Sequence, residues 1–178
     1  TALFFAGLLL YIIIHPLIAK SAMKKNIQMH PAVHPISTLT VPEFKKIAVA
    51  LDFSSNDKKL IAYAVGQGQK NSQYILLHIV ESPTATFHGS DSDDFETRED
   101  LDQLNQYVSQ LSRQNINAIA KLGFRNRVDE IVRIVKENKV DLLVIGAHGH
   151  TGLKDFMYGE TVNAVRHHLK IPVLVVNY

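Results

Sequence analysis

From Lys45 to the C-terminus, short apolar runs alternate with amphipathic stretches, and this alternation limits the possible folds more than any other feature of the sequence. The apolar runs predict strands at about 47–51, 74–80, 116–122, 142–145 and 173–176. Between them, apolar residues spaced three and four apart predict helices near 58–69, 101–111, 128–135 and 161–168. Strands that are interleaved with helices require crossover connections. We therefore expect an α/β domain with a five-stranded parallel sheet and helices on both faces.

Three segments that follow predicted strands carry polar or glycine-rich chemistry. Asp52 follows the first strand, Glu81 the second, and the glycine-rich stretch 146–152 (GAHGHTG) the fourth. In parallel sheets, ligands bind beyond the carboxyl ends of the strands, near the point where the strand order reverses. Glycines there allow backbone N–H groups to approach an anion. The spacing matches neither a Walker nor a Rossmann motif, so the residues alone leave two alternatives, a phosphate site or a tight connection.

The same segments resemble the nucleotide-binding type of the universal stress protein family. Gly146 and Gly149, followed after nine residues by Gly159 and then by the ending IPVLVV at 171–176, look like the signature of that family. The stretches KIAVALDFS at 46–54, LLHIV at 76–80 and VDLLVIG at 140–146 are similar to its first, second and fourth strands. The resemblance covers about residues 45–178. It implies a Rossmann-like fold of the adenine nucleotide alpha hydrolase type.

The resemblance also implies roles for individual residues. In ATP-binding members, the position matched by Asp52 contacts the adenosine end, the position matched by Ile79 lines the adenine pocket, and the three signature glycines bind phosphates through their backbone amides. The residues that the resemblance places at the ligand are Ala50, Leu51, Asp52, Ile79, Ile145, Gly146, Gly149, His150, Gly159, Glu160 and Thr161.

Glu160 departs from the family pattern, which has Ser or Thr directly after the last glycine. A carboxylate beside a triphosphate is repulsive by about one to a few kcal/mol in a partly buried site. This departure favours AMP, or another adenine nucleotide with less charge at that place, over ATP. Two other accommodations stay open, a rotation of Thr161 into the site and a cation such as Mg²⁺ that bridges Glu160 to the phosphates.

The N-terminal segment has a different character. Residues 2–14 (ALFFAGLLLYIII) are apolar without a break, residues 16–19 extend the run, and Lys20, Lys24 and Lys25 follow. This pattern predicts a transmembrane helix over residues 1–19 with the following residues in the cytoplasm. A buried soluble helix is the alternative. Because Thr1 is not a start methionine, we expect this helix to be the last span of a longer membrane protein. Residues 20–44 then form a linker, and residues 45–178 the universal stress protein domain.

These observations together favour a nucleotide-responsive regulatory module attached to a membrane transporter. Stress-protein domains follow several transporter types, including metal-ion transporters of the natural-resistance-associated macrophage protein family. The resemblance further implies a homodimer formed through the strand at 173–176. A nucleotide-free dimerisation module is the alternative. The sequence shows no nucleophile and base at a catalytic spacing, so at most we expect a slow ATPase.

Several other classes of function find no support in the composition. The chain has no cysteine, which excludes thiol catalysis and cysteine-ligated zinc, and its net charge of +2 gives no sign of nucleic-acid binding. We interpret the histidine pairs His148/His150 and His167/His168 as loop or surface residues, not metal ligands. His78 is expected to be a packed core histidine. Ser54 and Ser55 are interpreted as helix caps.

Overall fold

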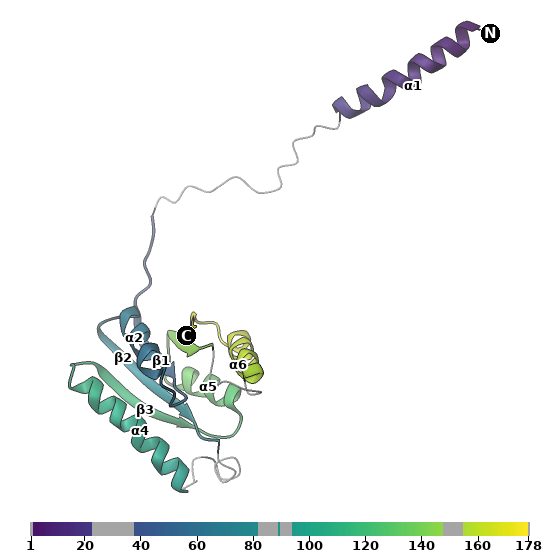
Figure 1. The fold of residues 1–178 in the computed structure, drawn as a ribbon. Coiled ribbons are helices and arrows are strands. Elements are labelled where there is room, and N and C mark those ends of the chain that lie inside the picture. The colour runs from purple at the N-terminus through teal and green to yellow at the C-terminus, as the bar shows by residue number, and fades with distance from the viewer. Residues whose placement is uncertain (1, 23–37, 82–88, 90–93, 148–154, 178) are drawn as a thin grey trace. The chain divides into compact units, whose positions relative to one another are not determined.

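The computed structural model describes residues 2–22, 38–81, 89, 94–147 and 155–177 of the chain (Figure 1). It divides the chain into two units, Thr1–Thr40 and Val41–Tyr178.

The first unit contains one helix, α1 (Ala2–Ala22), which includes Pro16. Its large apolar side chains from Phe4 to Ile14 are between 40% and 73% exposed. None of the helices in the described part of the chain combines enough length with enough apolar character to span a membrane. The spanning helix predicted at residues 1–19 is therefore not supported. Most of the predicted linker, residues 23–37, lies outside the described residues.

The second unit is built on one parallel sheet, as the alternating pattern predicts. Its strands are β1 (Phe44–Ala50), β2 (Gly68–Ile79), β3 (Asn117–Gly123), β4 (Leu142–Gly146) and β5 (Val173–Val176). They are ordered β3-β2-β1-β4-β5, and all four neighbouring pairs are parallel. The chain proceeds outward from β1 to β3 on one side and then returns to add β4 and β5 on the other. The strand order consequently reverses between β1 and β4.

Two pairs of helices cover the sheet, one pair on each face. The helices are α2 (Asp57–Gln67), α4 (Phe95–Ser112), α5 (Arg127–Glu137) and α6 (Asp155–His168). Leu60 of α2 and Leu104 of α4 belong to one buried cluster, together with Val49 of β1. Ile134 of α5 and Val165 of α6 belong to a second cluster on the other face. This arrangement confirms the predicted fold class.

The helix starts show how local sequence sets the boundaries. The Asp94 carboxylate accepts a hydrogen bond from the backbone N–H of Thr97 at 2.8 Å and so caps α4. At α2 the residue in the cap position is Asn56, and its side chain makes no capping bond. Ser54 Oγ instead accepts from the backbone N–H of Asn56 at 3.3 Å. The prediction that Ser54 and Ser55 cap this helix is thus wrong.

Strand β2 begins six residues before the predicted start at Tyr74. The extra residues, 68–73 (GQKNSQ), are polar and show no strand periodicity. A side chain holds them in place, because Ser72 Oγ donates to the carbonyl oxygen of Phe44 at 2.6 Å and accepts from the N–H of Gln69 at 2.7 Å. The strand is extended here by a side-chain bridge that a hydrophobic pattern does not reveal.

Asp141, the residue before β4, binds the first part of β1, although the two segments are far apart in the sequence. Its two carboxylate oxygens accept from the backbone N–H groups of Lys45 at 2.8 Å and Lys46 at 3.1 Å. The N–H of Asp141 in turn donates to the carbonyl oxygen of Lys46 at 2.9 Å. One side chain therefore joins the beginning of β1 to the beginning of β4.

Candidate functional site

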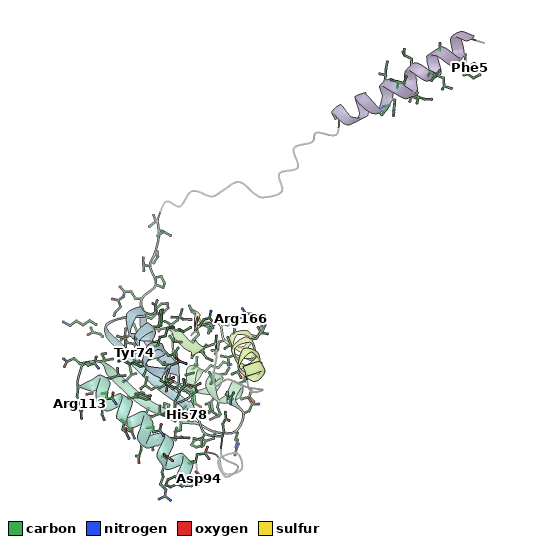
Figure 2. The ribbon with its side chains drawn as sticks, viewed as in Figure 1. Phe5, Tyr74, His78, Asp94, Arg113 and Arg166 are labelled. Atoms are coloured by element: carbon green, nitrogen blue, oxygen red, sulfur yellow. The ribbon has the colours of Figure 1, made fainter. Side chains whose placement is uncertain are left out.

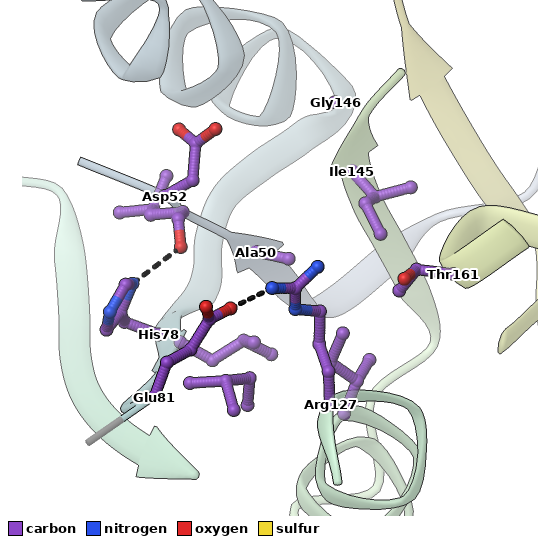
Figure 3. Close-up of a pocket in the computed structure, with 12 residues that line it drawn as sticks. Ala50, Asp52, His78, Glu81, Arg127, Ile145, Gly146 and Thr161 are labelled. Carbon is purple, nitrogen blue, oxygen red and sulfur yellow. Dashed lines mark hydrogen bonds and ion pairs between the residues drawn. The ribbon is translucent and has the colours of Figure 1, made fainter. Parts of the chain in front are cut away.

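A cavity of about 50 Å³ lies at the carboxyl ends of β1, β2 and β4, where the strand order reverses (Figure 3). This is the edge at which ligands bind in open parallel sheets. The twelve residues that line it are Ala50, Leu51, Asp52, Leu77, His78, Ile79, Glu81, Arg127, Ile131, Ile145, Gly146 and Thr161. Seven of the eleven residues that the sequence places at a ligand are among them: Ala50, Leu51, Asp52, Ile79, Ile145, Gly146 and Thr161.

The positions of the other four predicted site residues relative to the cavity stay predictions. Gly149 and His150 lie outside the described residues. Gly159 and Glu160 belong to helix α6, one residue or two before the buried Thr161. The effect of Glu160 on a phosphate stays a prediction.

The walls of the cavity combine apolar surfaces with a polar rim. Ile79 and Ile145 are 6% exposed, and Ile131 of α5 is 2% exposed. The acidic groups Asp52 and Glu81 follow β1 and β2. Small-molecule sites commonly pair apolar walls with a few well-placed polar groups. The arrangement suits a flat apolar ring with polar substituents at its edge.

The turn after β1 orients Asp52. The Asp52 carboxylate accepts from the backbone N–H of Ser54 at 3.1 Å. Between them Phe53 has a φ of 57°, in the left-handed region that side chains other than glycine rarely adopt. The chain bends sharply here, so that Asp52 lies at the cavity while α2 begins only a few residues later.

His78 lines the cavity near the end of β2, whereas Tyr74 lies earlier on the same strand (Figure 2). Its Nδ1 donates to the carbonyl oxygen of Leu51 at 2.9 Å, and its Nε2 lies 3.4 Å from Oδ2 of Asp100. Burial lowers the pKa of His78 and raises the pKa of Asp100 to about 6. The side chain of His78 is 15% exposed. The expectation of a packed core histidine therefore needs correction, because His78 forms part of the cavity wall.

Asp57, the first residue of α2, was missed by the sequence analysis as part of this region. It is 1% exposed, and neither carboxylate oxygen has a hydrogen-bond partner among the described residues. Burial raises its pKa to about 7, and the negative charge of Asp52 contributes further. An acidic residue in the first turn of a helix is usually a solvated partner of the helix dipole, so its burial could not be predicted from the sequence.

Arg127 was also missed. It is the first residue of α5, and its guanidinium forms an ion pair with the carboxylate of Glu81 across the cavity (Figure 3). The Arg127 side chain is 22% exposed and the Glu81 side chain 54% exposed. No signal in the sequence around Arg127 indicates this role, because it depends on where α5 begins relative to the end of β2.

Metal binding was tested by the arrangement of possible ligands. Within the described ranges, no group of three or more His, Cys, Asp or Glu side chains is placed to hold a metal ion. His148 and His150 lie outside those ranges.

The model of the universal stress protein family matches residues 43–177. The curated universal stress protein A homolog 2 of Coxiella burnetii is 32% identical over 141 residues, which cover 75% of this chain and 94% of that protein.

Solved structures show the same fold. The structure of protein MJ0577 has a TM-score of 0.62 at 24% identity, and the match covers 77% of this chain and 98% of that structure. The curated universal stress protein MJ0577 comes from Methanocaldococcus jannaschii. The universal stress protein from Archaeoglobus fulgidus in complex with dAMP has a TM-score of 0.55 at 19% identity, with 73% and 95% covered. A universal stress protein in complex with cAMP has a TM-score of 0.51 at 20% identity, with 76% and 98% covered.

Proposed function

Because the chain belongs to the universal stress protein family, we propose that its second unit binds an adenine mononucleotide in the cavity at the end of the sheet. The observation that carries this proposal is the convergence of seven family-matched residues on one cavity at the reversal of strand order. Two structural neighbours are complexes with dAMP and cAMP, which are adenine mononucleotides.

The lining residues contact different parts of the nucleotide according to their chemistry. The apolar side chains Ile79, Ile131 and Ile145 flank the base. The carboxylate of Asp52 accepts hydrogen bonds from ribose hydroxyls. The phosphate lies toward Gly146, at the end of β4, and toward the hydroxyl of Thr161 in α6.

A mononucleotide fits this chain better than ATP. Glu160 stands next to Thr161, where the family has a hydroxyl, and its carboxylate opposes additional phosphate charge. A monophosphate avoids most of this repulsion. Binding of ATP with Mg²⁺ between Glu160 and the phosphates is the alternative within the same site.

Calorimetric titration of AMP, cAMP, ADP and ATP into the full chain tests the proposal. We expect micromolar binding of AMP or cAMP, weaker binding of ATP, and recovery of ATP binding in Glu160→Ser. Asp52→Asn should weaken binding about tenfold, the loss of about 1.4 kcal/mol expected for a hydrogen bond to a charged group. Asp102→Asn, a change at an exposed carboxylate of α4, is the matched control and should bind as the natural chain does.

If the natural chain binds no nucleotide but the Glu160→Ser variant does, the nucleotide-free interaction module is favoured instead. If neither the natural chain nor any variant binds a nucleotide, nucleotide binding at this cavity is rejected. Time-dependent production of ADP, lost in Asp52→Asn, would add slow ATPase activity.

The biological setting remains a proposal that rests on the sequence. The exposed apolar side chains of α1 support an attachment of this segment to other apolar groups. We propose that the module regulates a membrane transporter to which it is fused. The full-length gene product, examined for membrane spans upstream of residue 1, tests this directly.

A further inference from the structure

The cavity is too small for the ligand that its residues suit. Its volume of about 50 Å³ is enough for only a few water molecules, each of which needs about 10–15 Å³ of cavity volume. Pockets that hold drug-sized ligands have volumes of roughly 300–1,000 Å³. At least one lining side chain must therefore move before a nucleotide can bind.

Arg127 is the side chain in the way. Its guanidinium extends from the start of α5 into the middle of the cavity, with Glu81 on one side and Thr161 on the other (Figure 3). Two of the large apolar side chains around it are held by packing, since Ile131 and Ile79 are 2% and 6% exposed and belong to the buried cluster under α5. Arg127 has the length and the rotatable bonds to leave the cavity without disturbing this cluster.

The ion pair with Glu81 contributes to holding Arg127 in the closed position. More than half of the Glu81 side chain is exposed, and ion pairs of this kind contribute only about 0–1 kcal/mol. The pair is thus weak enough to open at room temperature. The guanidinium itself stays charged in either position.

The free energy needed to separate Arg127 from Glu81 and open the cavity depends on the charge of the ligand. A neutral nucleoside displaces the guanidinium from Glu81 and offers it no anion in return. A nucleotide brings a phosphate, to which arginine can bind in bidentate geometry in place of a carboxylate. Among the twelve described lining residues, Arg127 is the one with a permanent positive charge.

We propose that Arg127 is a specificity-determining residue of this site, which closes the cavity while it is paired with Glu81 and admits ligands whose phosphate replaces the Glu81 carboxylate. The inference rests on the proposed nucleotide site and deepens it. The site then selects nucleoside monophosphates against the corresponding nucleoside, in addition to any selection by the base.

The test compares adenosine with AMP on the full chain and on three variants, by calorimetry at low ionic strength. We expect the natural chain to bind AMP at least tenfold more tightly than adenosine. In Arg127→Gln the ratio of the two affinities should fall severalfold, because AMP loses its cation while adenosine gains an open cavity. In Glu81→Gln the affinity for AMP should rise, since the competing carboxylate is gone. Arg133→Gln, on the same helix and also paired with glutamates but outside the cavity, should keep the ratio of the natural chain.

The outcomes separate this inference from the proposed function. If the natural chain binds AMP and Arg127→Gln keeps the full ratio, Arg127 does not select for phosphate and the inference is overturned while the nucleotide site stands. Weaker AMP binding in Glu81→Gln would also overturn it, because Glu81 would then contact the ligand itself. If no variant binds either ligand, the proposed function fails and the inference with it. Thermal unfolding of each variant confirms that the compared proteins are folded.

Discussion

The ring of Phe53 lies against the imidazole of His78, with the ring centroids 4.1 Å apart and an interplanar angle of 31°. Phe53 makes this contact from a left-handed backbone conformation, with a φ of 57°. The two observations oppose each other energetically. The left-handed conformation costs a residue with a side chain about 1–2 kcal/mol, whereas the packing of the aromatic ring on the core and on His78 is favourable.

Truncation of Phe53 should separate the cost of the left-handed backbone from the gain of the ring packing. We expect Phe53→Ala to lose the ring contact and keep the backbone strain, so that it destabilises the fold by roughly 2 kcal/mol or more. Phe53→Gly loses the same ring but tolerates the left-handed backbone, and should be more stable than Phe53→Ala by about 1 kcal/mol. Urea unfolding followed by far-UV circular dichroism measures both.

Phe44, at the start of β1 and packed on the same cluster, provides the matched comparison. Its φ is not in the left-handed region, so the order should reverse there, with Phe44→Ala at least as stable as Phe44→Gly. If glycine were also the less stable replacement at position 53, the strain at Phe53 would be negligible.

The buried carboxyl of Asp57 should make stability depend on pH. In the unfolded chain this group ionises near pH 3.8, whereas burial raises its pKa in the folded protein to about 7. The folded state therefore holds an extra proton between these two values, and its stability falls as the pH rises through that window and levels off above pH 7. A rise in pKa from 3.8 to about 7 corresponds to a total effect on the order of 4 kcal/mol.

Asp57→Asn removes the titrating proton with little change in shape. We expect this variant to gain stability relative to the natural chain as the pH is raised from 4 to 7, with a constant advantage above pH 7. Denaturant unfolding at several pH values from 4 to 8.5 gives the comparison. Asp102→Asn, at an exposed position of α4, should show no such trend. A difference between Asp57→Asn and the natural chain that does not change with pH would contradict the assigned cause.

Strand β5 forms an edge of the sheet and should mediate self-association if the chain dimerises as proposed. Its four residues carry no charge, and Val175 is 38% exposed. Unprotected apolar edges favour pairing between chains. Val175→Lys should shift the protein toward the monomer in sedimentation velocity over a range of concentrations. Leu101→Lys, at an exposed apolar position of α4, which packs mainly on β3 at the opposite edge of the sheet, should leave the distribution unchanged. An equal distribution for both variants would exclude β5 as the interface.

The carboxylate of Asp141 should matter for stability although it lies far from the cavity. Asp141→Ala leaves the N–H groups of Lys45 and Lys46 without their acceptor. Each bond to a charged acceptor contributes about 1.5 kcal/mol, less where the group is exposed, so we expect a loss of about 2 kcal/mol in the free energy of unfolding. Asp102→Ala provides the surface control. A loss no larger than that of the control would show that water replaces the carboxylate fully.

The parts of the molecule that depend on periodic patterns could be predicted from the sequence. The runs around Val49, Leu76 and Val144 are short and apolar because they are buried on both faces, and such runs identify parallel strands. Ala50, Ile79 and Ile145 could be placed at one site because they lie in strands whose carboxyl ends meet at the same edge.

Features that depend on how separate elements approach one another could not be predicted. The contact between Glu81 and Arg127 joins the residues just after β2 to the start of α5, across 46 residues of sequence. The burial of Asp57 follows from the packing around the start of α2, and its own neighbours in the sequence are polar. In both cases a residue of that type is more often solvated at such a position. The local sequence therefore predicts a solvated side chain and not the observed burial or ion pair.

The position of Asp141 has a mechanical consequence. The chain from the first unit joins the second at β1, a strand that is hydrogen-bonded on both sides, to β2 and to β4. A tension transmitted along β1 therefore loads two parallel ladders in shear, so that many hydrogen bonds must break together. The Asp141 carboxylate, bound to the second and third residues of that strand, is among the first contacts to experience the load. The second unit is consequently suited to resist being pulled open from its N-terminal end.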